Sequence, residues 1–153
     1  MNRILIATDG SDSAREALEF GLDLADEQDA WAFVVHVSPT VDALPNAGFG
    51  FLAPTVPHEF CEHDRVPLQE AIELAAEKDV SIRTELLKGN PADEIVAFAD
   101  TIGADLIVVG SRGHGVITGA LLGSVSRSVL HESRRPVLVV RGAHVAPEAG
   151  VAA

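Results

Sequence analysis

The sequence predicts an α/β domain built on an open, doubly wound, mostly parallel five-stranded sheet with helices on both faces. Short apolar runs alternate with segments of helical spacing along the whole chain. The run at residues 106–109, LIVV, is apolar throughout, which is typical of a parallel strand buried on both faces. Because each strand is followed by a helix, the connections are crossovers, and crossovers make neighbouring strands parallel.

The first elements follow from residues 3–37. Residues 3–7 are apolar and form the expected first strand, which the polar break at residues 8–11 ends. Ser13 and Glu16 have the spacing of a capping box and predict the start of a helix. Its buried face is predicted to contain Ala14, Ala17, Leu18, Gly21, Leu22 and Ala25. Residues 31–37 are the expected second strand.

The rest of the chain continues the alternation. Residues 38–57 contain four prolines and two glycines and are expected to form a long loop, to which we assign no role. A second helix begins at or before Pro67, and residues 81–87 alternate as a third strand. Asn90 and Pro91 predict a capped helix that Gly103 ends. After this helix we expect a strand over 106–109, a helix over 124–132 and a strand over 136–140.

The second helix is marked by apolar residues at helical spacing, which are Leu68, Ala71, Ile72, Ala75 and Ala76. The 153 residues are enough for one ordinary core. We expect one domain over residues 1–142 and a flexible tail over 143–153.

The net charge of the chain limits which classes of partner it can bind. The chain carries 11 Lys and Arg against 23 Asp and Glu, a formal net charge of −12. Such a surface repels nucleic acids, and no apolar run reaches membrane-spanning length. No signal peptide is apparent, so a cytoplasmic location is expected. The acidic excess also suggests a high-salt cytoplasm, a hypothesis that melting curves between low and molar KCl would test.

A glycine-rich loop after residues 106–109 has the composition of a phosphate site. Residues 110–124 contain five glycines before Ser124, which lies at the expected helix start, where free N–H groups attract anions. Residues 106–145 contain five arginines and one glutamate, whereas residues 1–105 contain 6 basic and 21 acidic groups. The local positive charge indicates a small phosphorylated ligand. Asp9, just past the first strand, is expected beside this loop or as a turn residue.

The spacing of Gly110, Gly113, Gly123 and Ser124 resembles the ATP-binding signature of the universal stress protein family, G-2x-G-9x-G-[ST]. The opening ILIATDGSDSAREAL and the closing RRPVLVVR resemble the first and last strands of that family. The resemblance implies ATP, or AMP, as the ligand, with any Mg²⁺ held mostly by phosphate and water. The implied nucleotide-binding residues are Ala7, Asp9, Val37, Val109, Gly110, Ser111, Arg112, Gly113, Gly123, Ser124 and Val125.

The resemblance also implies a homodimer paired through the last strand, at Val137, Leu138, Val139 and Val140. This run is apolar and lies at an otherwise open sheet edge, and exposed edges usually need a partner. The implied function is a nucleotide-dependent module of the stress response.

Three alternatives remain open. An adenylating or ATP-hydrolysing enzyme of a related fold would carry Ser-Gly-Gly-x-Asp-Ser after the first strand, and residues 8–13, TDGSDS, do not match. A nucleotide-free interaction module is disfavoured by the intact glycine signature. His58, Cys61 and His63 form one cluster, whereas structural zinc needs four ligands, so no metal site is expected. No catalytic residue is assigned, and any hydrolysis is expected to be slow.

Overall fold

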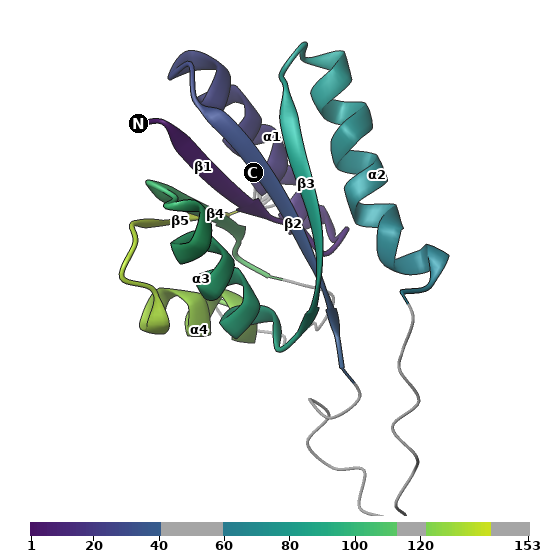
Figure 1. Cartoon of the computed structure of the whole chain (residues 1–153), viewed down its shortest axis with the longest axis vertical. Coiled ribbons are helices and arrows are strands. Elements are labelled where there is room, and N and C mark those ends of the chain that lie inside the picture. Colours follow the sequence, from purple (N-terminus) through teal and green to yellow (C-terminus); the bar gives the residue numbers. More distant parts are fainter. Residues whose placement is uncertain (41–59, 113–121, 142–153) are drawn as a thin grey trace, which may run out of the picture.

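The computed structural model describes residues 1–40, 60–112 and 122–141 (Figure 1). Within these ranges one sheet contains five parallel strands in the order β3-β2-β1-β4-β5. The predicted fold class is confirmed. The strands are β1 (Arg3–Ala7), β2 (Trp31–Pro39), β3 (Ile82–Gly89), β4 (Leu106–Gly110) and β5 (Val137–Val140), and the helices are α1 (Asp12–Glu27), α2 (Glu62–Glu77), α3 (Pro91–Ile102) and α4 (Ser124–Glu132).

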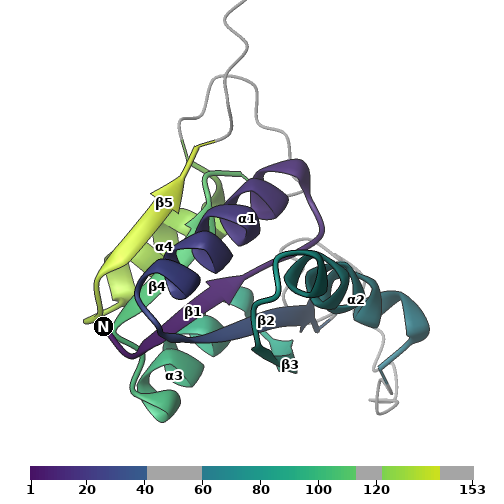
Figure 2. The same cartoon turned by 90° about the horizontal axis from the view of Figure 1, so that it is seen from above.

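Helices cover both faces of the sheet, α1 and α2 on one face and α3 and α4 on the other (Figure 2), and an apolar cluster lies under each pair. Alternate strand residues such as Ile4 and Val108 pack under α1 and α2, whereas Leu5 and Ile107 pack under α3 and α4. These four strand side chains are fully buried because β1 and β4 are central strands with helices on both faces. The predicted buried face of α1 is confirmed: all six of its expected residues are buried.

The predicted capping box at the start of α1 is wrong. The N-cap is Ser11, whose hydroxyl accepts a hydrogen bond from the Ala14 N–H at 3.2 Å. Ser13 already lies inside the helix. Both serines precede apolar residues at helical spacing, so the local pattern did not separate them. The predicted cap of α3 is confirmed, because Asn90 accepts from the N–H groups of Ala92 and Asp93, and Gly103 has φ 63°.

Four of the five strands, β2, β3, β4 and β5, have bounds that differ by one or two residues from those expected. β2 continues through Ser38 and Pro39, which pair with Lys88 and Gly89 of β3, so the predicted loop begins later. α2 begins at Glu62 after the N-cap Cys61, which confirms the predicted start at or before Pro67. All five residues expected to mark this helix lie in it; Leu68, Ala71 and Ala75 are buried, whereas Ile72 and Ala76 are exposed. The rest of the predicted loop and the predicted tail lie outside the described residues.

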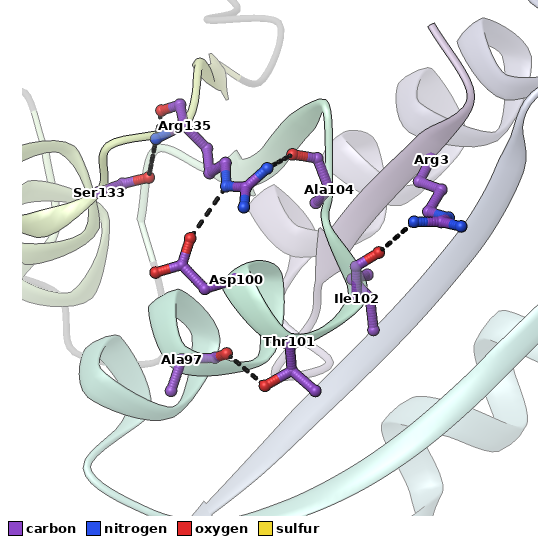
Figure 3. A network of polar contacts seen from close by, with 8 residues as sticks. All are labelled: Arg3, Ala97, Asp100, Thr101, Ile102, Ala104, Ser133 and Arg135. Atoms are coloured by element: carbon purple, nitrogen blue, oxygen red, sulfur yellow. Dashed lines mark hydrogen bonds and ion pairs between the residues drawn. The ribbon is translucent and has the colours of Figure 1, made fainter.

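Polar contacts fasten the sheet at the amino ends of its strands (Figure 3). Arg135, just before β5, donates from Nε to Asp100 of α3 and from Nη1 to the carbonyl of Ala104, both at 2.9 Å. Arg3 donates to the carbonyl of Ile102 at 2.9 Å. In the described ranges, no helix combines the length and apolar character needed to cross a membrane.

Candidate functional site

The sheet reverses its winding between β1 and β4. From β1 the chain continues to α1 on one face, and from β4 it continues to α4 on the other. The two connections leave in opposite directions, which opens a crevice at the carboxyl ends of the two strands. In open α/β sheets this point is the usual ligand-binding position.

A cavity of about 540 Å³ occupies this crevice. One end lies at the end of β4 and the start of α4, including Gly110, Gly123 and Ser124. Its middle is lined by the turn after β1, and its other end by β2 and the first turns of α2, including Val37 and Pro67. The volume lies within the range of small-molecule sites, and residues of three neighbouring strands, β2, β1 and β4, line the cavity.

Hydrogen bonds bring the two ends of the glycine-rich loop together. The N–H of Gly123 donates to the carbonyl of Ser111 at 2.6 Å, and the N–H of Ser111 donates to Val140 of β5 at 2.9 Å. The buried hydroxyl of Ser126 donates to the carbonyl of Gly110 at 2.5 Å. These bonds fix the N-terminus of α4 against the end of β4.

The N-terminus of α4 is open toward the cavity. Gly123 is its N-cap, and no described side chain caps this terminus. Ser124, Val125 and Ser126, the first three residues of α4, all line the cavity. The first N–H groups of a helix have no intrahelical partner and carry the positive end of the helix dipole. This end of the cavity therefore favours an anion, and Arg112 adds a positive charge there.

The other end of the cavity has a different polarity. Asp64 and Glu70 line it together with His36 and His63, and Asp9 lines the middle. The Nδ1 atom of His36 lies 2.8 Å from the carbonyl oxygen of Thr8, which orients the ring. A ligand with a phosphate at one end and hydrogen-bond donors at the other matches this distribution of charge.

Hydrogen bonds hold Asp64 in its ionised form. Burial alone would raise the pKa of this carboxyl, but bonds from the Ser38 hydroxyl and from the Cys61 N–H and thiol outweigh it and lower the pKa. The Ser38 bond measures 2.8 Å and the Cys61 N–H bond 2.8 Å. Asp64 thus joins the end of β2 to the start of α2 at the cavity wall.

The sequence profile of the universal stress protein family matches residues 1–141. The chain belongs to this family. A universal stress protein of Methanocaldococcus jannaschii is 41% identical over 142 residues, which cover 91% of this chain and 81% of the relative. Universal stress protein YxiE of Bacillus subtilis is 38% identical over 148 residues, covering 92% and 99%.

Solved universal stress proteins have the same fold. One from Archaeoglobus fulgidus superposes with a TM-score of 0.69 at 28% identity, over 91% of this chain and 97% of the other. A universal stress protein in complex with cAMP superposes with a TM-score of 0.67, also at 28% identity, over 91% and 95%. Both values lie well above the level of chance similarity in topology.

This universal stress protein brings most of its sequence-predicted site residues to one cavity. Nine of them line it: Ala7, Asp9, Val37, Val109, Gly110, Arg112, Gly123, Ser124 and Val125. Ser111 is buried beside the cavity, and its hydroxyl lies 3.4 Å from that of Ser13. Gly113 lies outside the described residues.

Sequence reasoning missed the wall that α2 contributes. His63, Asp64, Val66, Pro67 and Glu70 line the cavity although they follow β2 by more than twenty residues. No local motif marks them, because only the packing of α2 beside the turn after β1 places them there. His63, considered at first as a metal ligand, belongs to this wall, and Cys61 is the N-cap of α2. His58 lies outside the described residues.

Proposed function

We propose that this protein binds ATP in the cavity between β1 and β4 and acts as a nucleotide-dependent, cytoplasmic module of the stress response. The observation that carries the proposal is the open N-terminus of α4, fastened to the end of β4 and facing a cavity of about 540 Å³. Backbone N–H groups at such a terminus bind phosphate without any lysine.

The charge distribution supports one orientation of the nucleotide. The phosphates would lie against Gly123, Ser124 and Val125, with Arg112 as a further cation. The ribose and base would extend past Asp9 toward Val37, where apolar side chains from β2, α2 and α3 line the cavity. An adenine amino group donates hydrogen bonds, which suits the acidic residues at that end.

The universal stress protein solved with cAMP supports an adenine nucleotide as the ligand class. The preference for ATP rests on the glycine signature, and AMP is the smaller ligand that the same contacts would accept. In the described residues, no group of three or more His, Cys, Asp and Glu side chains is arranged to hold a metal ion. We therefore propose that any Mg²⁺ would be held by phosphate and water.

Calorimetry with the Gly123→Val variant tests the site. A branched side chain at the N-cap of α4 would keep phosphate from the first N–H groups of the helix. Because hydrogen bonds to charged groups contribute about 1.5–3 kcal/mol, the Kd for ATP should rise about tenfold or more. Ala97→Val adds similar bulk to the exposed face of α3, away from the cavity, and should leave the affinity unchanged.

Mass analysis of small molecules released from the heat-denatured protein should reveal an adenine nucleotide. An ATP affinity that is the same in the wild type and in Gly123→Val would refute the site. Thin-layer analysis of ATP incubated with the protein distinguishes a binding module from an enzyme. Rapid release of AMP and pyrophosphate, or of ADP, would favour an adenylating or ATP-hydrolysing enzyme.

A further inference from the structure

Two serines of α1 contact the first residues of the glycine-rich loop. The hydroxyl of Ser13 accepts a hydrogen bond from the N–H of Arg112 at 3.2 Å. The hydroxyl of Ser11 donates to the carbonyl of Arg112 at 3.5 Å. Both polar groups of the Arg112 backbone are therefore held from the opposite layer of the fold, and we name this pair, Ser11 and Ser13, the serine clamp.

The start of α1 and the end of β4 are packed too closely for a side chain between them. A Cβ atom on Gly110 would lie 2.7 Å from the backbone carbon and oxygen of Ser13. Real contacts of a Cβ atom are essentially never that short, and backbone cannot move aside as a flexible side chain can. The serine clamp thus acts over a direct contact between two backbones.

The hydroxyl of Ser13 is available for this contact because α1 does not need it as a cap. Ser11 is the N-cap and accepts from Ala14. Ser13 is the second residue of the helix, and its hydroxyl reaches the N–H of Arg112 and the hydroxyl of Ser111 instead. The side chain of Ser13 therefore contacts a distant loop and does not cap its own helix.

We propose that Ser13 is a positioning residue for the phosphate-binding loop. It fixes the Arg112 peptide where the loop leaves β4, while the bond from Gly123 to Ser111 fixes the other end. With both ends held, less conformational entropy is lost when a nucleotide binds, because the N–H groups of α4 already face the cavity. This role rests on the proposed nucleotide binding.

Calorimetry with ATP and hydrogen exchange of the nucleotide-free protein test Ser13→Ala together. The variant should weaken ATP binding about three- to tenfold, the effect of one lost hydrogen bond of ordinary strength. Exchange at the Arg112 amide should accelerate, because its acceptor is gone. Ser13→Thr keeps the hydroxyl and should restore both values toward those of the wild type.

Ser133→Ala is the matched control. Its hydroxyl also accepts a backbone N–H, from Arg135 at 3.0 Å, but this bond lies before β5, whereas that of Ser13 reaches Arg112 at the start of the glycine-rich loop. The control should change neither ATP affinity nor exchange at Arg112. Unchanged exchange at Arg112 in Ser13→Ala would overturn the proposal, and so would faster exchange with unchanged ATP affinity. If the wild type binds no adenine nucleotide, the proposed function fails, and exchange at Arg112 alone decides whether Ser13 holds the loop.

Discussion

At the scale of single residues, Asp64 shows how one carboxylate organises a cavity wall. It lies at the third position of α2 and accepts from the N–H of Cys61, which satisfies a donor at the helix N-terminus. Its other oxygen accepts from Ser38 at the end of β2. The ends of the long connection between β2 and α2 are thereby joined beside the site. The ionised carboxylate accepts all of these bonds, whereas protonation would turn one of its two oxygens into a donor.

The lowered pKa of Asp64 predicts an acid-dependent contribution to stability. Its folded pKa lies below the ordinary 3.8, so at low pH the folded state binds fewer protons than the unfolded state. The contribution is therefore complete above about pH 4 and is lost as pH falls through the folded pKa. Urea unfolding should show wild type more stable than Asp64→Asn at pH 7, and the difference should shrink toward pH 3.

Glu73→Gln, on the exposed surface of the same helix, is the control for removing one negative charge. Its difference from the wild type should stay within about 0.5 kcal/mol at pH 7. A constant difference between wild type and Asp64→Asn from pH 7 to pH 3 would contradict the assigned role of the carboxylate.

Site residues that lie close together in the sequence could be predicted from it, whereas those brought to the cavity from distant segments could not. Gly110, Gly123 and Ser124 lie within one strand-loop-helix unit, so their spacing alone indicated where the helix terminus would be. Asp64 and Glu70 reach the same cavity only through the packing of a helix that follows a long connection. Ser13 was recognised as a helix-start residue, but its contact with Arg112 spans 99 positions and has no local signal.

At the scale of elements, Arg135 connects three parts of the fold at the edge away from the site. It precedes β5, pairs with Asp100 near the end of α3, and donates to Ala104 before β4 (Figure 3). Ala104 is fully buried, so its carbonyl has little access to water if this donor is removed. An unsatisfied buried polar group costs about 1–3 kcal/mol.

Arg135→Met should therefore lower the free energy of unfolding by about 1–3 kcal/mol in urea titrations. Arg15→Met is the matched control, because Arg15 forms an exposed ion pair with Glu19 at 3.5 Å, with side chains 68% and 46% exposed. Such a pair contributes about 0.2–0.5 kcal/mol. Equal losses in the two variants would show that the bridge to Ala104 and Asp100 contributes no more than a surface pair.

Element type was predictable throughout the described ranges, whereas some boundaries were not. The start of α3 carried its own signal, since Asn90 and Pro91 combine a cap with a fixed φ. β2 had no such signal at its end. It extends through Pro39 because β3 is present beside it to pair with, and that pairing is a tertiary contact.

At the scale of the whole molecule, β5 is the last strand on one side of the sheet, and no segment within the described ranges pairs with its outer side. The carbonyls of Pro136 and Val140 accept from Ile107 and Ser111, so they face β4. Because successive residues of a strand point their N–H and C=O groups to opposite sides, those of Val137 and Val139 face the open edge. The four residues of β5 are only partly buried in the isolated chain. A second copy pairing along this edge would cover them.

We therefore propose the homodimer through Val137, Leu138, Val139 and Val140, and a proline scan of β5 tests it. Val139→Pro removes an N–H that faces outward and should yield a monomer in analytical ultracentrifugation while retaining the helical circular dichroism of the wild type. Leu138→Pro removes an N–H directed at β4 and should instead lower the melting temperature, because it breaks the ladder inside one chain. A monomeric wild type, or a Val139→Pro variant that remains dimeric, would exclude pairing along this edge.

The same strand accepts the N–H of Ser111 at the end of β4, so the edge and the cavity share one backbone contact. ATP affinity of Val139→Pro should stay close to that of the wild type, because the Val140 carbonyl that accepts from Ser111 is unchanged.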